Sequence, residues 1–125
     1  MSPSPSSNIL IVDDDPTFVK LLENILKDHN CKYISTTEAA DGLQIAMSQK
    51  PDIIVLDVMM PIINGFNFCH ILKSQEAYKN IRIIMVTSRD EKEDIEFGRK
   101  AGADAYLTKP LNTQEFLKTI DQLLK

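Results

Sequence analysis

Short apolar runs alternate along the chain with segments in which apolar residues recur every three or four positions. The runs are rich in Ile and Val and are mostly continuous, as parallel strands covered on both faces require. They predict strands over residues 9–12, 33–36, 53–56, 81–86 and 105–107, of which the second and the last have the weaker pattern.

Between these runs the apolar positions form single stripes, which predicts one amphipathic helix after each strand. The stripes consist of Phe18, Leu21, Leu22, Ile25 and Leu26; of Ala39, Ala40, Leu43, Ala46 and Met47; of Phe66, Cys69 and Leu72; of Ile95, Phe97 and Ala101; and of Phe116, Leu117, Ile120, Leu123 and Leu124. Capping residues support these helices, with Asn64 before the third, Gly102 after the fourth, and Asn112 or Thr113 before the fifth.

Five repeats of a strand followed by a helix leave few topologies, because such crossovers are right-handed. A TIM barrel needs about twice this length. We therefore expect a doubly wound, flavodoxin-like α/β fold with five parallel strands in the order 2-1-3-4-5. One domain would span residues 8–125, after a flexible tail over residues 1–7, whose Pro and Ser residues cannot offset the entropy lost on ordering.

The composition excludes several classes of function. The 125-residue chain has a net charge of −4 and a sequence pI of about 5.1, which argues against nucleic-acid binding by phosphate neutralisation. Its two cysteines, Cys31 and Cys69, are too few for a disulfide scaffold and lack the spacing of zinc ligands. Because no signal peptide and no run of about 18 apolar residues is visible, we expect a cytoplasmic protein without membrane association.

Polar side chains capable of chemistry follow the predicted strands. The first strand leads into Asp13, Asp14 and Asp15, the third into Asp57, the fourth into Thr87 and Ser88, and the fifth into Thr108, Lys109 and Pro110. Doubly wound folds bind ligands beyond these carboxyl ends. Carboxylates crowded there repel one another, which raises the pKa of at least one of them or requires a bound cation, and their hard oxygen atoms suit Mg²⁺. With a lysine and a hydroxyl nearby, the set predicts phosphoryl transfer, and the central Asp57 could accept the group covalently.

Each of these residues taken singly also has a plain structural interpretation. A run of aspartates can form a solvated turn, and we assign Asp15 to the cap of the first helix. Asp13 and Asp14 keep a functional interpretation, because Asp57 lies opposite them at the end of the neighbouring strand.

Four segments, ILIVDDDP, DIIVLDVMMPIINGF, IIMVTS and GADAYLTKP, occur in the order and spacing of a response-regulator receiver domain, which the chain resembles over residues 8–125. The resemblance implies a phosphoacceptor switch of a two-component system. A sensor histidine kinase or a histidine phosphotransfer protein would phosphorylate Asp57 in the presence of Mg²⁺. It also implies that Asp14 and Asp57 bind Mg²⁺ directly, with the backbone carbonyl of Met59, and that Asp13 binds it through water.

The same resemblance implies roles for the residues after the last two strands. Lys109 would hold a phosphoryl oxygen, and its peptide bond to Pro110 would be cis. Thr87 would move to bond the phosphoryl group, and the rotamer of Tyr106 would follow it inward. These movements would change the surface formed by the fourth helix, the fifth strand and the fifth helix.

That surface implies an output partner or a fused output domain, and it could form a homodimer. The chain would catalyse only its own phosphorylation and dephosphorylation, without turnover of a substrate. Because Met59 and Arg89 flank the site and neither can orient a water molecule, we expect slow hydrolysis of the phosphorylated form. The alternatives are a non-phosphorylated interaction module of the same fold, or an aspartate-nucleophile phosphatase, whose second acid is replaced by Met59.

Overall fold

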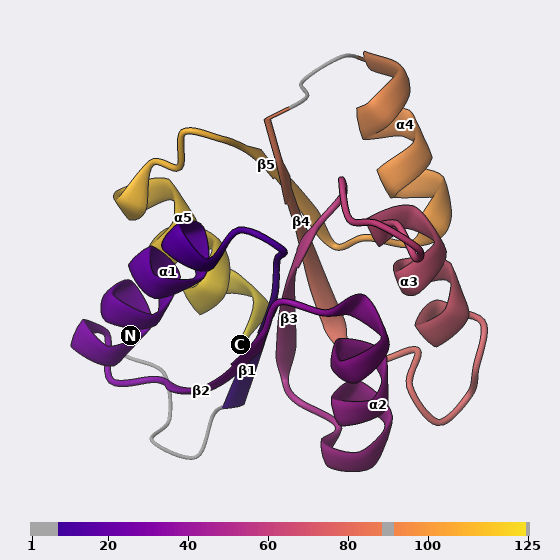
Figure 1. The fold of residues 1–125 in the computed structure, drawn as a ribbon, viewed down its shortest axis with the longest axis horizontal. Helices are drawn as coiled ribbons and strands as arrows, with labels where there is room; N and C mark the ends of the chain where they lie inside the picture. Colours follow the sequence, from indigo (N-terminus) through magenta and orange to yellow (C-terminus); the bar gives the residue numbers. More distant parts are fainter. Residues whose placement is uncertain (1–7, 89–91, 125) are drawn as a thin grey trace.

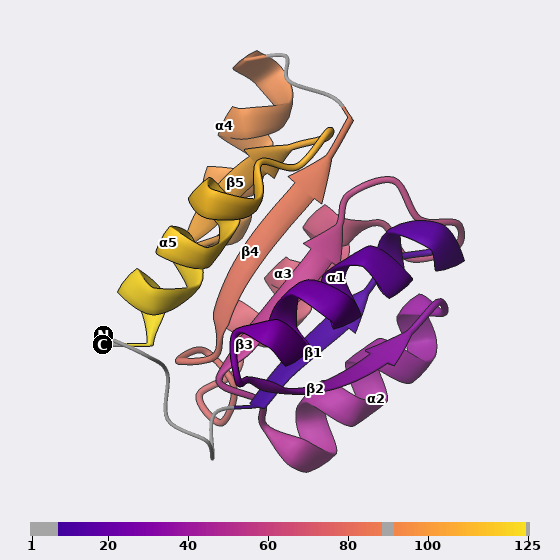
Figure 2. The ribbon, with the colours of Figure 1, turned by 90° about the vertical axis from the view of Figure 1, so that its left-hand side faces the viewer.

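Five parallel strands form one central sheet in a computed structural model, which describes residues 8–88 and 92–124 apart from the side chains of 92–95 and 97. The strands are β1 (Asn8–Val12), β2 (Lys32–Thr36), β3 (Ile53–Asp57), β4 (Arg82–Thr87) and β5 (Ala105–Thr108). Their order is β2-β1-β3-β4-β5, with every neighbouring pair parallel (Figure 2). The predicted fold class and strand order are therefore confirmed. The expected tail over residues 1–7 lies outside the described part of the chain.

Helices cover both faces of the sheet. They are α1 (Pro16–Asp28), α2 (Ala39–Gln49), α3 (Gly65–Lys73), α4 (Lys92–Ala101) and α5 (Thr113–Leu123). Helices α1 and α5 lie on one face and α2, α3 and α4 on the other (Figure 1). The side chains of Asp15, Asn64 and Asn112 each accept a backbone N–H in the first turn of the helix that follows, so the predicted caps are confirmed. None of the described helices is long and apolar enough to cross a membrane.

Successive side chains of each strand point to opposite faces of the sheet, and because helices cover both faces, the strand sequences are continuously apolar. In β1, Ile9 and Ile11 pack against α1 and α5, whereas Leu10 and Val12 pack against the α2 and α3 side. All four are at most 1% exposed. Because both faces of the sheet are buried, both sets of side chains must be apolar.

Two positions in the predicted stripes are wrong. Leu21 is 46% exposed, and α1 buries Val19 instead. In α2, Ala40 is exposed and Gly42 is buried instead, whereas in α3 the expected Phe66 is half-buried and packs against the core. Several apolar residues within one turn can each fit a helical stripe, and the direction in which the helix crosses the sheet selects among them. The expected stripe of Ile95 and Phe97 on the fourth helix lies outside the described side chains.

A partly exposed ion pair joins α3 to the amino ends of β4 and β5, at the edge of the sheet opposite the carboxyl ends. Lys73 Nζ lies 2.9 Å from an oxygen of Asp104 and donates hydrogen bonds to the carbonyl oxygens of Ile81 (2.6 Å) and Lys79 (3.1 Å). The same Asp104 oxygen accepts the N–H of Ile83 (2.8 Å). We call these residues the Lys73–Asp104 cluster. It fixes the amino ends of both strands relative to α3.

Candidate functional site

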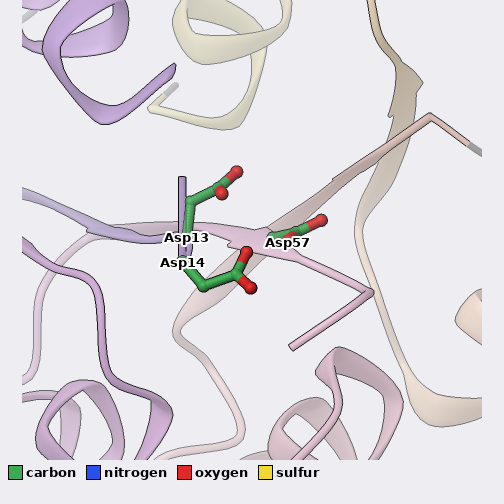
Figure 3. A group of neighbouring side chains, drawn as sticks. All are labelled: Asp13, Asp14 and Asp57. Atoms are coloured by element: carbon green, nitrogen blue, oxygen red, sulfur yellow. The ribbon is translucent and has the colours of Figure 1, made fainter. Parts of the chain in front are cut away.

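Three carboxylates meet beyond the ends of β1 and β3. Because Val12 is paired in register with Leu56, the residues that follow them emerge side by side. Asp13, Asp14 and Asp57 each place a carboxylate oxygen within 4.8 Å of those of the other two (Figure 3). Asp13 is 2% exposed and Asp57 5%, whereas Asp14 is open to solvent. The structure thus brings together the three acids that the sequence suggests.

Burial and mutual repulsion raise the pKa of both inner acids. Loss of solvation, followed by the charge of Asp13, raises the pKa of Asp57 from its ordinary 3.8 to about 6. The charge of Lys109 and the N–H of Met59, which donates to an oxygen of Asp57 at 3.3 Å, act in the opposite direction. Burial also raises the pKa of Asp13, although the N–H of Asp15 and the ammonium of Lys109 both donate to it. The pocket therefore holds negative charge at neutral pH that the protein stabilises only in part.

Lys109 supplies the positive charge from the far side of the pocket. Its Nζ lies 2.9 Å from Oδ2 of Asp13 and 3.9 Å from Oδ1 of Asp57. The backbone holds the residue in place, because the N–H of Lys109 donates to the carbonyl oxygen of Thr87 at 2.7 Å. The peptide bond between Lys109 and Pro110 is cis, the isomer that the receiver resemblance implies. One ammonium group thus faces two buried carboxylates.

The ring of Phe18 is a part of this site that the sequence analysis did not identify. Phe18 lies in the first turn of α1, and Lys109 Nζ lies 4.1 Å from the centroid of its ring. The sequence does contain a signal for it, because an aromatic residue stands one helical turn after the acidic run. Such a residue faces the same edge of the sheet as the acids.

The candidate switch residues lie on β4, which neighbours β3, and on β5, the next strand beyond it at the edge of the sheet. Thr87 ends β4 and is fully buried. Tyr106 in β5 is half-buried, and its ring lies close against Gly98 of α4, where an added Cβ would stand 2.9 Å from Cδ2 of the ring. An aromatic ring thus lies between the end of the sheet and α4. The roles suggested for Thr87 and Tyr106 depend on the phosphorylated state and remain predictions.

The loop after β3 packs tightly around Asp57. Gly65 donates its N–H to the carbonyl oxygen of Val58 at 2.9 Å, and an added Cβ there would lie 2.6 Å from the backbone oxygen of Asp57. Only glycine permits this approach, which brings the start of α3 against the end of β3. Within the same loop, the side chain of Met59 is 52% exposed beside the site. Arg89, expected on the other side, lies outside the described residues.

The donor atoms of the site fit a divalent cation. Carboxylates are hard oxygen ligands, and a site that combines a few of them with open positions for water suits Mg²⁺. The exposure of Asp14 leaves such positions beside the buried Asp13 and Asp57. The charges of the described residues agree, because among them Lys109 is one positive group against three carboxylates.

The receiver class of signalling domains is defined by a doubly wound sheet whose strand ends carry paired carboxylates, a buried threonine and a lysine. The sequence profile described as "Response regulator receiver domain" matches residues 9–121. The chain belongs to the response regulator receiver domain family, in which the phosphoacceptor role is general.

Individual relatives agree with this membership. The chain is 36% identical to protein PilH of Pseudomonas aeruginosa over 94% of its own length and 98% of PilH. It is 35% identical to the alkaline phosphatase synthesis transcriptional regulatory protein PhoP of Bacillus subtilis over 96% of its own length, but spans only 49% of PhoP. Among solved structures, the signal receiver domain of a DNA-binding response regulator from Colwellia psychrerythraea superimposes with a TM-score of 0.90 at 32% identity, covering 95% of this chain and 98% of that one.

Proposed function

We propose that this protein is a phosphoacceptor switch in which Asp57 receives a phosphoryl group from a histidine of a sensor kinase or a phosphotransfer protein. The observation that supports this most is the position of Asp57. It is a buried carboxylate at the centre of an acidic trio, with the ammonium of Lys109 at 3.9 Å. A carboxylate in this setting is a nucleophile surrounded by groups able to neutralise phosphoryl oxygens.

The transfer follows from these contacts. An ionised oxygen of Asp57 attacks phosphorus, an O–P bond forms, and the P–N bond to the donor imidazole breaks with its electron pair returning to nitrogen. A pKa of about 6 leaves Asp57 ionised at neutral pH, so attack needs no general base. Lys109, already within reach of Asp57, holds a phosphoryl oxygen as negative charge builds on it.

The acids beside Asp57 have a separate task. Mg²⁺ would be held by Asp14, Asp57 and the backbone carbonyl of Met59, with Asp13 acting through water. When bound, the ion would neutralise negative charge on the transferring group. Asp13 meanwhile keeps Lys109 in the pocket through the 2.9 Å contact between them.

The phosphorylated state would be read on the surface of α4, β5 and α5. Thr87 lies at the end of β4, one residue beyond the partner of Asp57 in the sheet, so its hydroxyl can move to an oxygen on phosphorylated Asp57. Tyr106 then moves into the space that Thr87 leaves, and its contact with Gly98 carries the change to α4. An output partner, or a second copy of this chain, would bind the altered surface.

The chain would phosphorylate itself from small donors such as acetyl phosphate, since it supplies the catalytic groups, but it would not turn over a substrate as an enzyme does. Intact mass after incubation with acetyl phosphate tests this, with and without Mg²⁺. We expect one added phosphoryl group on the wild-type protein that requires Mg²⁺ and is lost in Asp57→Ala. Asp15→Ala is the matched control, because the side chain of Asp15 caps α1 while its N–H, which donates to Asp13, is kept, and this variant should still be phosphorylated. No adduct on the wild-type protein, together with no Mg²⁺ binding, would favour an interaction module that works without phosphorylation.

A further inference from the structure

The ammonium of Lys109 is enclosed on three sides. Oδ2 of Asp13 lies 2.9 Å from it, Oδ1 of Asp57 3.9 Å, and the centroid of the Phe18 ring 4.1 Å. Phe18 is only 9% exposed, so its ring excludes water from the side it covers. The face of an aromatic ring carries partial negative charge and attracts a cation. The ring thus replaces part of the hydration shell that the ammonium would otherwise keep.

The two carboxylates do not hold the ammonium equally. Oδ1 of Asp13 accepts the N–H of Asp15 at 2.9 Å, so Asp13 is itself fixed, and its other oxygen takes the short contact with Lys109. Before transfer, Lys109 is therefore bound mainly to Asp13. To hold an oxygen of a phosphoryl group on Asp57, the ammonium has to loosen this contact and move toward Asp57.

We propose that Phe18 is a positioning residue for Lys109, whose ring face keeps the ammonium in the pocket while it moves from Asp13 toward the phosphoryl group on Asp57. The inference rests on the proposed function. A hydrogen bond is directional and weakens as the donor shifts, whereas the attraction of a ring face changes little over such a movement. The desolvated surroundings strengthen the interaction of the ammonium with the developing charge.

A purely structural role for Phe18 would depend on the volume of its side chain and not on the charge of its ring face. Phe18 also belongs to the core that α1 and α5 form with the sheet, together with Leu22 and Phe116. Packing in that core requires an apolar side chain of suitable volume, but it does not require negative charge on the ring face. Changing the charge of the ring without changing its shape therefore separates the two roles.

Site-specific replacement of Phe18 by mono-, di- and trifluorinated phenylalanine makes this change, because each fluorine withdraws charge from the ring face. The measurement is the rate constant for phosphorylation by acetyl phosphate in saturating Mg²⁺. We expect it to fall stepwise, by about three- to tenfold for the trifluorinated ring, which corresponds to roughly 0.6 to 1.4 kcal/mol. A rate that does not depend on fluorination overturns the inference.

A double-mutant cycle tests whether Phe18 acts through Lys109. Phe18→Leu should slow phosphorylation in the wild-type background and leave the residual rate unchanged in Lys109→Met. Phe116→Leu removes a ring from the same core and should lower stability without slowing the reaction of folded protein. Equal slowing by Phe18→Leu in both backgrounds, or by Phe116→Leu, contradicts the proposed role.

One readout does not depend on activity. In Mg²⁺-free wild-type protein, the ring should shift the NMR signals of the side-chain methylene protons of Lys109 upfield, and Phe18→Leu should abolish the shift; a shift that persists in Phe18→Leu contradicts the contact.

The outcomes of these experiments also distinguish the role of Phe18 from the proposed function. A wild-type protein that takes no phosphoryl group overturns both. A wild-type protein that is phosphorylated at a rate indifferent to the ring overturns only the role of Phe18.

Discussion

Replacing Asp57 by asparagine should stabilise the protein in the absence of Mg²⁺. The carboxylate is 5% exposed and lies among other acids, so the folded state holds its charge at a cost that the unfolded chain does not have. Asparagine keeps the size of the side chain and an oxygen that can accept the N–H of Met59. It removes only the charge.

The magnitude follows from the pKa of Asp57, which burial raises from 3.8 to about 6. Between these values the folded protein keeps a proton that the unfolded chain has released, so the stability contributed by the protonated form is complete below pH 3.8 and is lost as the pH rises through 6. About two pKa units at 1.36 kcal/mol each give a loss of about 3 kcal/mol. The gain from Asp57→Asn should therefore be about 3 kcal/mol at pH 7.5 and less than about 1 kcal/mol at pH 4.

Urea unfolding in the presence of a chelator, at pH 4 and at pH 7.5, measures both values. Asp15→Asn is the matched control, since asparagine caps a helix as well as aspartate does and Asp15 lies outside the acidic trio. It should change the free energy of unfolding by less than about 0.5 kcal/mol at either pH. A variant Asp57→Asn that is no more stable than the wild type at pH 7.5, or that gains equally at both pH values, would refute the reasoning.

Four other outcomes follow from the same structure. Mg²⁺ at a hundred times its dissociation constant should stabilise the wild-type protein by about 2.7 kcal/mol in thermal unfolding, and a smaller gain is expected for Asp57→Asn because it lacks one ligand charge. Lys73→Met should lower the free energy of unfolding by about 1 to 2 kcal/mol, because it removes the hydrogen bonds of Lys73 to two backbone carbonyls and leaves Asp104 with Arg82 as its cation; a loss below about 0.5 kcal/mol in urea contradicts this. Gly65→Ala should destabilise by about 1 to 3 kcal/mol and slow phosphorylation, since its Cβ would displace the backbone at Asp57, and unchanged unfolding and kinetics would count against that close approach. Met59→Gln, which adds an amide able to orient water, should speed hydrolysis of the phosphorylated form several-fold by intact mass, while Met59→Leu should not.

The sequence was sufficient to predict the fold because each of its signals is local. Runs such as residues 53–56 are apolar on both faces, and caps such as Asn64 lie at the helix ends where the structure has them. The carboxylate trio was predictable for a related reason. Once the strand order is known, the residues that follow neighbouring parallel strands must share one edge.

What could not be predicted depends on how the helices cross the sheet. Whether Leu21 or Val19 is buried is decided by the side of α1 that meets the core, and the stripe alone allows either. The spacing after the acidic run places Phe18 at the edge of the sheet that carries the acids, but its contact with Lys109 joins the first helix to the turn after β5 and depends on how α1 crosses the sheet. Lys73 has the sequence context of an ordinary lysine at a helix end, yet it forms an ion pair with Asp104 and donates to two backbone carbonyls.

The acidic pair, Asp57, the threonine and the lysine each lie at the end of a different strand, and the lysine follows β5, the last strand of this sheet in chain order. A chain still in the ribosome, or one whose final strand has come loose, therefore has carboxylates but no ammonium beside them. Under the proposed function, such a chain lacks the ammonium that would hold a phosphoryl oxygen on Asp57, so small phosphodonors would phosphorylate it far more slowly. Because the reacting groups come together only when the whole sheet is complete, phosphorylation under the proposed function would also report that the molecule is fully folded.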